Sequence, residues 1–547
     1  MMEIPNECYL EILKNLQSHH ESLFSCLLVS RQWCRNVIPI LWREPPLNNG
    51  RLIRTLLLEL NEEQASLILL EIIFPDNRKP IFEYTSYIRS LDTSNLEIGI
   101  KSWLDSEGHG PRDSVVYSTK YGKSNHVVQA IRSSLIAMIL RKCRNLKQLC
   151  IDGVTDYTMA KLLAEFLYGN AILTSLSLNR SLLGFKEEKM LIEASGKINN
   201  LNSLSLNCNL SNHENVKALS KIICDNITLT SLDLSLSPIN FGNVKIIVEA
   251  LYKNTTLTVL DLCSCGLDFR SIELLAEAVC KNTTLTYLDL GENELGFEEG
   301  RRLVRILYEN TTLSTLKFKY NNFGLEEAKL FSEALHKNTT LISLDLGGND
   351  FGIEGMKILV KILQNNTTLT SLDLSENQLG SKGVKLLARA LRENNTLTSL
   401  DISSCELGPE GIKSLSKGLC YNFALKDLNI GDNQFGLFGM MGLLEVLYRN
   451  TTLTNLNLSR NQLDVRGMIL IEKVFCINIA IKSLDLSNNY IGFEGCKLLA
   501  NALKGNTTLT YLNLDSNNIT TKERTILRKL FSTNITLDLS ADFNFFY

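Results

Sequence analysis

Hydrophobic and polar positions follow one pattern that repeats every 28 residues through most of the chain. In each period a short stretch alternates leucine with polar residues, as in residues 285–290, and so predicts a strand with one buried face. An amphipathic run follows, for example residues 297–307, and predicts a helix. The turn between them carries Gly, Asn or Asp, which accept a positive φ or cap a helix. Each period is therefore strand, turn, helix, turn.

Two columns of residues keep this period. Asparagine recurs every 28 residues from Asn226 to Asn534, where a helix is expected to turn back into the next strand in the left-handed conformation. Several of these asparagines begin Asn-x-Thr triplets, but a helix-ending role explains them better than glycosylation. The second column is the motif LxxLxLxxN, which defines a leucine-rich repeat. Its first leucines, from Leu146 to Leu509, mark fourteen units, and the shorter first unit is predicted to be a cap.

Stacking of these units predicts a parallel sheet with strands ~4.8 Å apart, whereas outer helices need ~10 Å each. The predicted fold class is therefore α/β, a leucine-rich-repeat horseshoe solenoid with a concave sheet over residues 146–547. Ladder asparagines at the strand ends are expected to bond backbone groups that the turns leave unpaired. They are Asn209, Asn293, Asn321, Asn349, Asn377, Asn433, Asn461, Asn489 and Asn517.

This repeat length and strand-helix form resemble the ribonuclease-inhibitor-like class of leucine-rich repeats. The resemblance covers residues 146–547 and implies a binding scaffold. That class includes inhibitors, GTPase activators, immune sensors and ubiquitin-ligase receptors, so the fold leaves these functions open.

Residues 1–47 lie outside the repeat and carry apolar positions that predict short packed helices. Pro5 suits the first turn of a helix, and Pro39 is predicted to end or kink the last one. About forty residues is marginal for independent stability, so this segment is expected to pack on a partner or on the adjoining chain.

The order of these residues resembles the F-box. The family pattern is matched by Ile4-Pro5, Glu7, Ile12-Leu13, Val29-Ser30-Arg31-Gln32-Trp33 and Leu41-Trp42. The departures from the pattern are Ile4, Ser30 and His19-His20-Glu21. The resemblance implies that the module docks on the Skp adaptor of a Skp-cullin-F-box ubiquitin ligase, while the repeats bind a protein substrate. By this resemblance, the residues expected to contact the adaptor are Ile4, Pro5, Ile12, Leu13, Leu16, Val29 and Trp33. The alternative is a helical cap on a stand-alone scaffold of the inhibitor, sensor or GTPase-regulator type.

Residues 48–145 are predicted to be a connecting helical segment and N-terminal cap. An apolar helical run covers residues 52–74, and residues 127–143 also favour a helix leading into the first repeat. Between them, residues 99–126 contain few apolar side chains and many helix-breaking residues, so an exposed, mobile insertion is expected there.

The concave face is predicted to carry an acidic stripe, because aspartate recurs between the two inner leucines of successive strands. Carboxylates ~5 Å apart repel weakly even in water, so the stripe favours a cationic partner. Alternatively, Leu-Asp-Leu is simply the default sequence of this repeat. Lys317, Lys319 and Tyr320 interrupt the stripe, either as a partner contact or as a drifted repeat that neutralises Asp289 and Asp345. The candidate substrate-binding residues are Asp233, Asp261, Asp289, Lys317, Lys319, Tyr320, Asp345, Asp373 and Asp401.

Composition narrows the function further. A net charge of −3 means that the chain has no excess of basic residues for binding nucleic acid. No run of apolar residues approaches the ~18 that a membrane span needs. The N-terminus does not resemble a secretory signal, so a cytoplasmic or nuclear protein is expected. Fourteen cysteines without a CxxC pair favour reduced, packed thiols. No metal-ligand spacing, phosphate-binding loop or nucleophile motif occurs, so a non-catalytic protein without metal or cofactor is predicted.

Overall fold

A computed structural model describes residues 11–13, 15–16, 20–60, 80–106, 121–153, 157–179, 184–207, 210, 212–475, 478–531 and 535–539. The chain divides into two compact units. Unit 1 comprises Met1–Val259, and unit 2 comprises Leu260–Tyr547.

Unit 1 begins with a small helical module. Its helices α2 (His20–Leu27) and α3 (Arg31–Leu41) pack around Leu13, Leu23 and Val37. The hydroxyl of Ser30 caps α3 by accepting a hydrogen bond from the Trp33 backbone N–H at 3.2 Å. Pro39 was predicted to end or kink this helix, but α3 continues to Leu41. The missing N–H of Pro39 lies in the last turn, where the Trp42 N–H still reaches the Ile38 carbonyl at 3.0 Å.

The segment that follows the helical module joins it to the repeats. It forms α4 (Gly50–Leu57), η1 (Tyr84–Tyr87), strand β1 (Ser90–Asp92), α6 (Leu96–Ser106) and α7 (Tyr121–Lys142). The prediction of a mobile insertion is wrong for residues 99–106, because they complete α6 and Trp103 is fully buried. Residues 107–120 of that prediction lie outside the described residues, and the prediction is also wrong for residues 121–126, which begin α7. β1 was not predicted, and it pairs in parallel with the first repeat strand.

The repeats of unit 1 alternate strands and helices as predicted. Strands β1 to β5 form a parallel sheet in which each pairs with the next in sequence. The strands after β1 are β2 (Gln148–Asp152), β3 (Ser175–Asn179), β4 (Ser203–Ser205) and β5 (Ser231–Asp233). The helices are α8 (Tyr157–Gly169), α9 (Phe185–Ser195), α10 (His213–Asp225) and α11 (Phe241–Leu251), and β6 (Val259–Asp261) spans the division between the units.

Unit 2 continues the same alternation. Its strands are β7 (Tyr287–Asp289), β8 (Thr315–Lys317), β9 (Ser343–Asp345), β10 (Ser371–Asp373), β11 (Ser399–Asp401), β12 (Asp427–Asn429), β13 (Asn455–Asn457), β14 (Ser483–Asp485), β15 (Tyr511–Asn513) and β16 (Thr536–Asp538). Its helices are α12 (Phe269–Lys281), α13 (Phe297–Glu309), α14 (Leu325–Lys337), α15 (Gly352–Asn365), α16 (Gly380–Glu393), α17 (Gly408–Leu419), α18 (Gly436–Arg449), α19 (Val465–Phe475), α20 (Gly492–Ala502) and α21 (Thr521–Leu530), with the short η2 (Leu503–Gly505) after α20. Strands β2 to β15 begin the predicted repeat units, and β16 is an additional strand.

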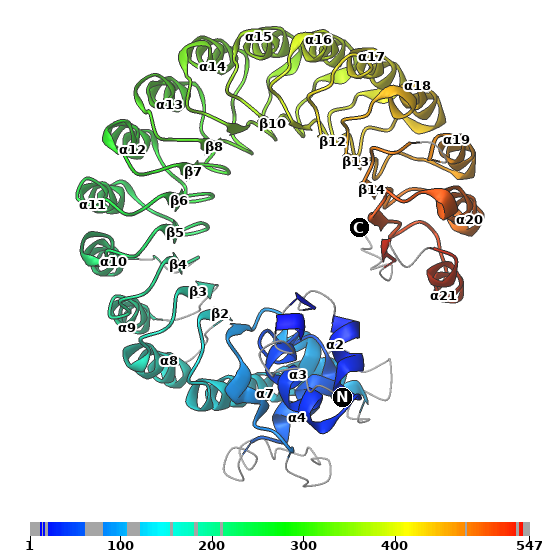
Figure 1. Ribbon diagram of the computed structural model, residues 1–547. Helices are drawn as coiled ribbons and strands as arrows, with labels where there is room; N and C mark the ends of the chain where they lie inside the picture. Colours follow the sequence, from blue (N-terminus) through cyan, green and yellow to red (C-terminus); the bar gives the residue numbers. More distant parts are fainter. Residues whose placement is uncertain are drawn as a thin grey trace. The chain divides into compact units, whose positions relative to one another are not determined.

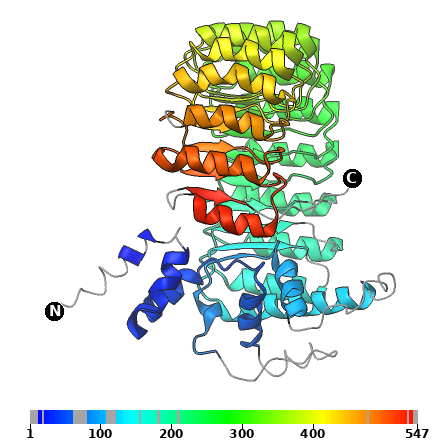
Figure 2. The ribbon, with the colours of Figure 1, turned by 90° about the vertical axis from the view of Figure 1, so that its right-hand side faces the viewer.

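Within unit 2 the strands line the inner side of an arc and the helices its outer side (Figure 1). Every strand from β7 to β16 pairs in parallel with its neighbour in sequence, with equivalent residues opposite one another. The helices of this unit that are coloured from yellow through orange to red follow one another in one row (Figure 2). The predicted leucine-rich-repeat solenoid with a parallel inner sheet is confirmed.

The turn positions behave as predicted in two ways. Asn212, Asn240 and Asp268 cap the following helix by accepting hydrogen bonds on their side chains. Gly380 instead has a φ of +56°, and no atom lies within 4 Å of the place where a Cβ would stand. Glycine is therefore needed there for the backbone angle and not for space.

Where an asparagine of the column is the residue that ends a helix, its conformation differs from the prediction. Asn310 is extended (φ −80°, ψ 136°) and not left-handed. In this conformation its Oδ1 accepts from the N–H groups of Thr312 and Leu313 at 2.9 and 2.7 Å, while Nδ2 donates to the Val279 carbonyl at 2.7 Å. One amide thus joins the segment that leads into β8 to the end of α12 in the preceding unit. The amide nitrogen that a glycan would need is already hydrogen-bonded and buried.

The ladder asparagines bond the backbone as predicted. Asn321 is a typical example, because its Nδ2 donates to the carbonyls of Leu290 and Phe318 at 3.1 and 3.0 Å. Where Cys405 replaces asparagine, its thiol donates to the Leu374 carbonyl at 3.2 Å. Cys265 and Cys405 are buried, which confirms that these thiols pack inside the repeats. Asn209 lies outside the described residues.

Candidate protein-interaction surfaces

The aspartates of the inner sheet accept backbone hydrogen bonds in the turn that follows each strand. Oδ1 of Asp345 accepts from the Gly347 N–H at 3.0 Å, and Oδ1 of Asp373 accepts from the Ser375 N–H at 2.8 Å. Asparagine makes the same contact at the equivalent positions Asn429, Asn457 and Asn513. The turn therefore needs an oxygen acceptor and not a charge, which supports reading Leu-Asp-Leu as the default of the repeat. The charge is an additional property of the strands that carry aspartate.

Three of these carboxylates lie in register on neighbouring strands. Asp345 is opposite Asp373, which is opposite Asp401. Burial, together with the charge of Asp373, raises the pKa of Asp345 to about 6, and burial also raises the pKa of Asp373. The carboxylate of Asp401 accepts hydrogen bonds from two side chains, the Ser403 hydroxyl at 2.6 Å and the Asn429 amide at 2.7 Å.

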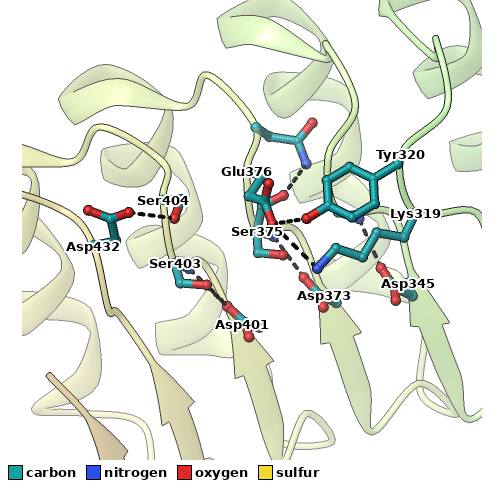
Figure 3. Close-up of polar contacts among 12 residues, drawn as sticks. Lys319, Tyr320, Asp345, Asp373, Ser375, Glu376, Asp401, Ser403, Ser404 and Asp432 are labelled. Atoms are coloured by element: carbon teal, nitrogen blue, oxygen red, sulfur yellow. Dashed lines mark hydrogen bonds and ion pairs between the residues drawn. The ribbon is translucent and has the colours of Figure 1, made fainter. Parts of the chain in front are cut away.

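The lysines of β8 and its turn pair with neighbouring acids. Nζ of Lys317 lies 3.8 Å from Oδ2 of Asp289, which confirms one of the two neutralising contacts predicted for a drifted repeat. Nζ of Lys319 lies 3.5 Å from Oε1 of Glu376, and the Tyr320 hydroxyl donates to the same carboxylate (Figure 3). This hydrogen bond raises the pKa of Tyr320.

Glu376 was missed by the sequence analysis. It lies 56 residues after Tyr320, which is two repeats, and the two residues occupy the same position of the unit. The repeat between them carries Gly347 and Gly348. Because glycine has no side chain, nothing there keeps the Tyr320 and Glu376 side chains apart. A Cβ on Gly348, whose φ is +60°, would overlap the Tyr320 ring. The pair of glycines between two bulky residues in one column is the signal that identifies this contact.

The remaining predicted concave residues divide between the units. Asp233 belongs to unit 1, where its carboxylate accepts from the Ser205 hydroxyl at 2.9 Å and the Ser235 N–H at 3.0 Å. Asp261 belongs to unit 2, and its carboxylate accepts from the Cys263 N–H at 2.9 Å. Six of the predicted residues lie on β8 to β11 or in the turns that follow these strands, namely Lys317, Lys319, Tyr320, Asp345, Asp373 and Asp401.

The residues proposed for the adaptor contact differ in exposure. Ile12 and Val29 are 48% and 63% exposed. Leu13 is only 1% exposed and belongs to the core of the module, against which Leu16 and Trp33 pack. Ile4 and Pro5 lie outside the described residues. Two further exposed apolar side chains of the module, Phe24 and Leu28, were not singled out from the sequence.

A groove of about 940 Å³ lies in unit 1 along α9 and α10. The asparagine column is interrupted beside it, because Ile198 stands between Asn170 and Asn226 and has no amide to close the turn. Its lining is Tyr168, Lys189, Glu193, Gly196, Lys197, Asn199, Asn200, Glu214, Lys217, Ala218, Lys221, Ile222, Asp225, Asn226, Ile227 and Thr228. Lysines and acids alternate there, and Glu214 contacts both Lys189 and Lys217. The groove therefore selects no single sign of charge.

Within the described ranges, no group of three or more His, Cys, Asp or Glu residues is placed to hold a metal ion. None of the helices in the part of the chain that the structure describes is both long and apolar enough to cross a membrane.

Comparison with known families supports the repeat assignment. Seven segments match the family model described as Leucine Rich repeat, namely residues 281–298, 337–360, 365–388, 393–416, 449–471, 478–500 and 505–522. No curated protein matches the chain. Among solved structures, "Leiomodin-1 Actin-Binding Site 2 (ABS2)" is 25% identical, with 28% of this chain and 88% of that chain covered and a TM-score of 0.24. The protein thus contains multiple leucine-rich repeats, an arrangement that generally serves as a non-catalytic protein-interaction scaffold.

Asp345→Asn is expected to stabilise the protein at neutral pH. A carboxylate whose folded-state pKa is raised to about 6 contributes stability that is complete below its unfolded pKa and is lost as the pH rises through 6. The gain near pH 7 should be about 1 kcal/mol after allowance for solvent screening, and it should shrink towards pH 5. Asparagine keeps the bond to the Gly347 N–H, as Asn429 does in its own repeat.

Denaturant titrations at both pH values measure this difference. Asp350→Asn, which removes an exposed charge from the same repeat, is the control and should change the free energy of unfolding little at either pH. An Asp345→Asn variant that is no more stable than the parent protein at neutral pH contradicts the prediction.

Proposed function

We propose that the protein is the non-catalytic substrate-recognition subunit of a Skp-cullin-F-box ubiquitin ligase. In this proposal the N-terminal helical module docks on a Skp-type adaptor, which connects it to the cullin, and the concave face of the repeats binds a protein substrate. The observation that carries the proposal is the F-box-like order of residues 4–42 in a chain that continues into leucine-rich repeats.

The packing of the module supports an external partner. Its own core of Leu13, Leu23 and Val37 is closed, yet Ile12, Phe24, Leu28 and Val29 remain 48%, 63%, 82% and 63% exposed. Exposed large apolar side chains gathered in one small element are typical of a surface that another protein covers. Burial of a full side chain of this size contributes about 1.5–3 kcal/mol, so this set offers substantial binding energy.

Ile12→Asp combined with Val29→Asp is expected to reduce capture of a purified Skp-type adaptor by the full-length protein at least about tenfold. Each substitution places a charge where the complex would bury an apolar side chain, and a buried unpaired charge is strongly unfavourable. Both residues are exposed in the isolated chain, so the variant should keep the thermal stability of the parent protein.

The matched control is Ile81→Asp combined with Ile98→Asp. These isoleucines are 91% and 57% exposed in unit 1 but lie outside the module, so adaptor capture should not change. Leu13→Ala is unsuitable, because loss of a buried core residue would unfold the module itself. Undiminished capture by the Ile12→Asp, Val29→Asp variant rules out the proposed docking face.

A second candidate is a stand-alone interaction scaffold in which the N-terminal helices are a cap. One observation favours it: α3 also contacts the rest of unit 1, where the Trp42 and Tyr84 rings lie 4.4 Å apart and the Arg89 N–H donates to the Arg43 carbonyl at 2.9 Å. Deletion of residues 1–47 would break these contacts, so the Ile12→Asp, Val29→Asp variant is the cleaner discriminator. Failure of the intact protein to bind any Skp-type adaptor, with repeat-dependent binding of another protein retained, favours this candidate.

A further inference from the structure

The inner sheet of unit 2 concentrates negative charge around β8 to β11. We define the β7–β11 face as five segments, each a strand with part of its turn: residues 287–292, 315–320, 343–348, 371–376 and 399–404. They contain six carboxylates and two lysines, a net charge of −4, whereas the whole chain carries −3. Both lysines already contact acids, Lys317 at Asp289 and Lys319 at Glu376. This surface is therefore complementary to a positively charged partner.

The centre of the face is the space above Gly347. A Cβ built on this glycine would lie 2.8 Å from Oγ of Ser375, 3.2 Å from Oδ1 of Asp373 and 3.2 Å from Cε of Lys319. Ser375 is only 2% exposed, and its hydroxyl hydrogen-bonds the Asp373 carboxylate. The hydrocarbon stem of Lys319 thus lies on the same side of Gly347 as this hydroxyl and the Asp373 carboxylate. A cation in this space therefore lies beside the Asp373 carboxylate.

Lys319 occupies this position through contacts that another cation can replace. Its ammonium group is 3.5 Å from Glu376, with side-chain exposures of 31% and 39%, and it lies 4.9 Å from the centroid of the Tyr320 ring. Ion pairs with this degree of exposure contribute little to stability. The carboxylates of Asp345 and Asp373 also lie in register beside it (Figure 3). A lysine or arginine side chain from outside would meet these carboxylates and Glu376 at once.

We propose that the β7–β11 face binds a basic segment of a partner protein, and that one lysine or arginine side chain of this segment takes the place of Lys319 above Gly347. The inference specifies the substrate class for the proposed substrate-binding role of the repeats and rests on that role. A protein segment fits better than an isolated metal ion, because the acids are spread along successive strands and the described residues form no metal-binding group.

The first test uses the full chain and a fluorescent peptide of alternating lysine and serine, with a glutamate-serine peptide as its negative counterpart. The triple variant Asp345→Asn, Asp373→Asn, Asp401→Asn should bind the lysine peptide about tenfold or more weakly. It should remain folded, because asparagine fills the same position at Asn429, Asn457 and Asn513. The control Glu298→Gln, Glu326→Gln, Glu354→Gln removes the same charge from outer helices and should leave binding nearly unchanged.

The second test removes the internal occupant. Lys319→Met should tighten binding of the lysine peptide several-fold, because the peptide no longer competes with Lys319. Lys329→Met changes the net charge equally on the outer helix α14 and should have no such effect. Equal effects of Lys319→Met and Lys329→Met, equal weakening by the two triple variants, or unchanged binding by the aspartate variant overturns the proposal.

Adaptor capture by the same variants separates this inference from the proposed function. The aspartate variant should capture the Skp-type adaptor as well as the parent protein does. Loss of adaptor binding with peptide binding retained would remove the ligase assignment and leave the basic-segment site standing. Peptide binding that is insensitive to the aspartates, with adaptor capture intact, would remove only the site.

Discussion

Phe331→Ala is expected to lower the free energy of unfolding of unit 2 by about 3–5 kcal/mol. Phe331 of α14 is 1% exposed, and its ring stacks on Phe318 at 5.6 Å and meets Phe323 edge-on at 5.3 Å. Truncation to alanine removes both ring contacts and leaves a cavity that neighbouring repeats cannot fill without moving. Denaturant unfolding followed by circular dichroism measures the loss.

Phe331→Leu is the matched control. Leucine occupies the equivalent position in the two neighbouring repeats, at Leu303 and Leu359, and both are buried. This variant should lose only about 1–1.5 kcal/mol. Because repeat arrays can unfold in parts, hydrogen exchange of unit 2 should also locate the weakened repeats around α14. A Phe331→Ala variant as stable as Phe331→Leu contradicts the prediction.

The same aromatic layer supports the candidate binding face. Phe318, which directly follows β8, is buried, whereas Lys317 and Lys319 on either side of it along the chain point to the opposite face. Phe331→Ala is therefore expected to weaken binding of a basic peptide as well as stability, while Phe331→Leu should preserve both.

Asn433→Ala should destabilise unit 2 by a similar amount, about 3–5 kcal/mol, although it removes few atoms. The Asn433 amide nitrogen donates to the carbonyls of Ile402, Ile430 and Gly431 at 2.9, 3.1 and 3.0 Å. Its oxygen accepts from the N–H groups of Cys405 and Leu407 at 3.0 and 3.2 Å. Alanine leaves five backbone groups without these partners in a fully buried place. Thermal and denaturant unfolding measure the effect.

Asn433→Cys provides the graded comparison. Cysteine already stands on this ladder at Cys405, where its thiol donates to the carbonyls of Leu374 and Ser403 at 3.2 and 3.3 Å. The thiol replaces part of the donor function but not the oxygen acceptor, so roughly half of the loss should be recovered. If alanine and cysteine have the same effect, the ladder bonds are not what asparagine contributes.

Much of the fold was predictable from the sequence because the repeat is a local property. The strand and helix of each unit follow from leucine spacing within 28 residues, and parallel stacking follows from repetition of that unit. The conformation of the asparagine column was predicted wrongly. Asn310 must be extended to reach Val279 of the preceding unit, a requirement that is visible only when two units are placed side by side.

The candidate surfaces were predicted less completely. Lys319 and Tyr320 were identified as exceptions in their column, but their partner Glu376 was not, because the contact crosses a whole repeat over Gly347 and Gly348. In the N-terminal module, Ile12 and Leu13 are adjacent and equally apolar in sequence, yet one is 48% exposed and the other 1%. Helix packing decides which of two such neighbours is available to a partner.

The amino-acid sequence alone determined the repeat period, the parallel order of the strands and the residue types at every turn, since each of these depends on spacing within one unit or between equal units. The tertiary structure alone decided which charges are neutralised and which apolar side chains remain exposed. The physical reason is distance: spacing along a chain sets local conformation, whereas the pairing of charges and the burial of side chains depend on neighbours that only folding brings together.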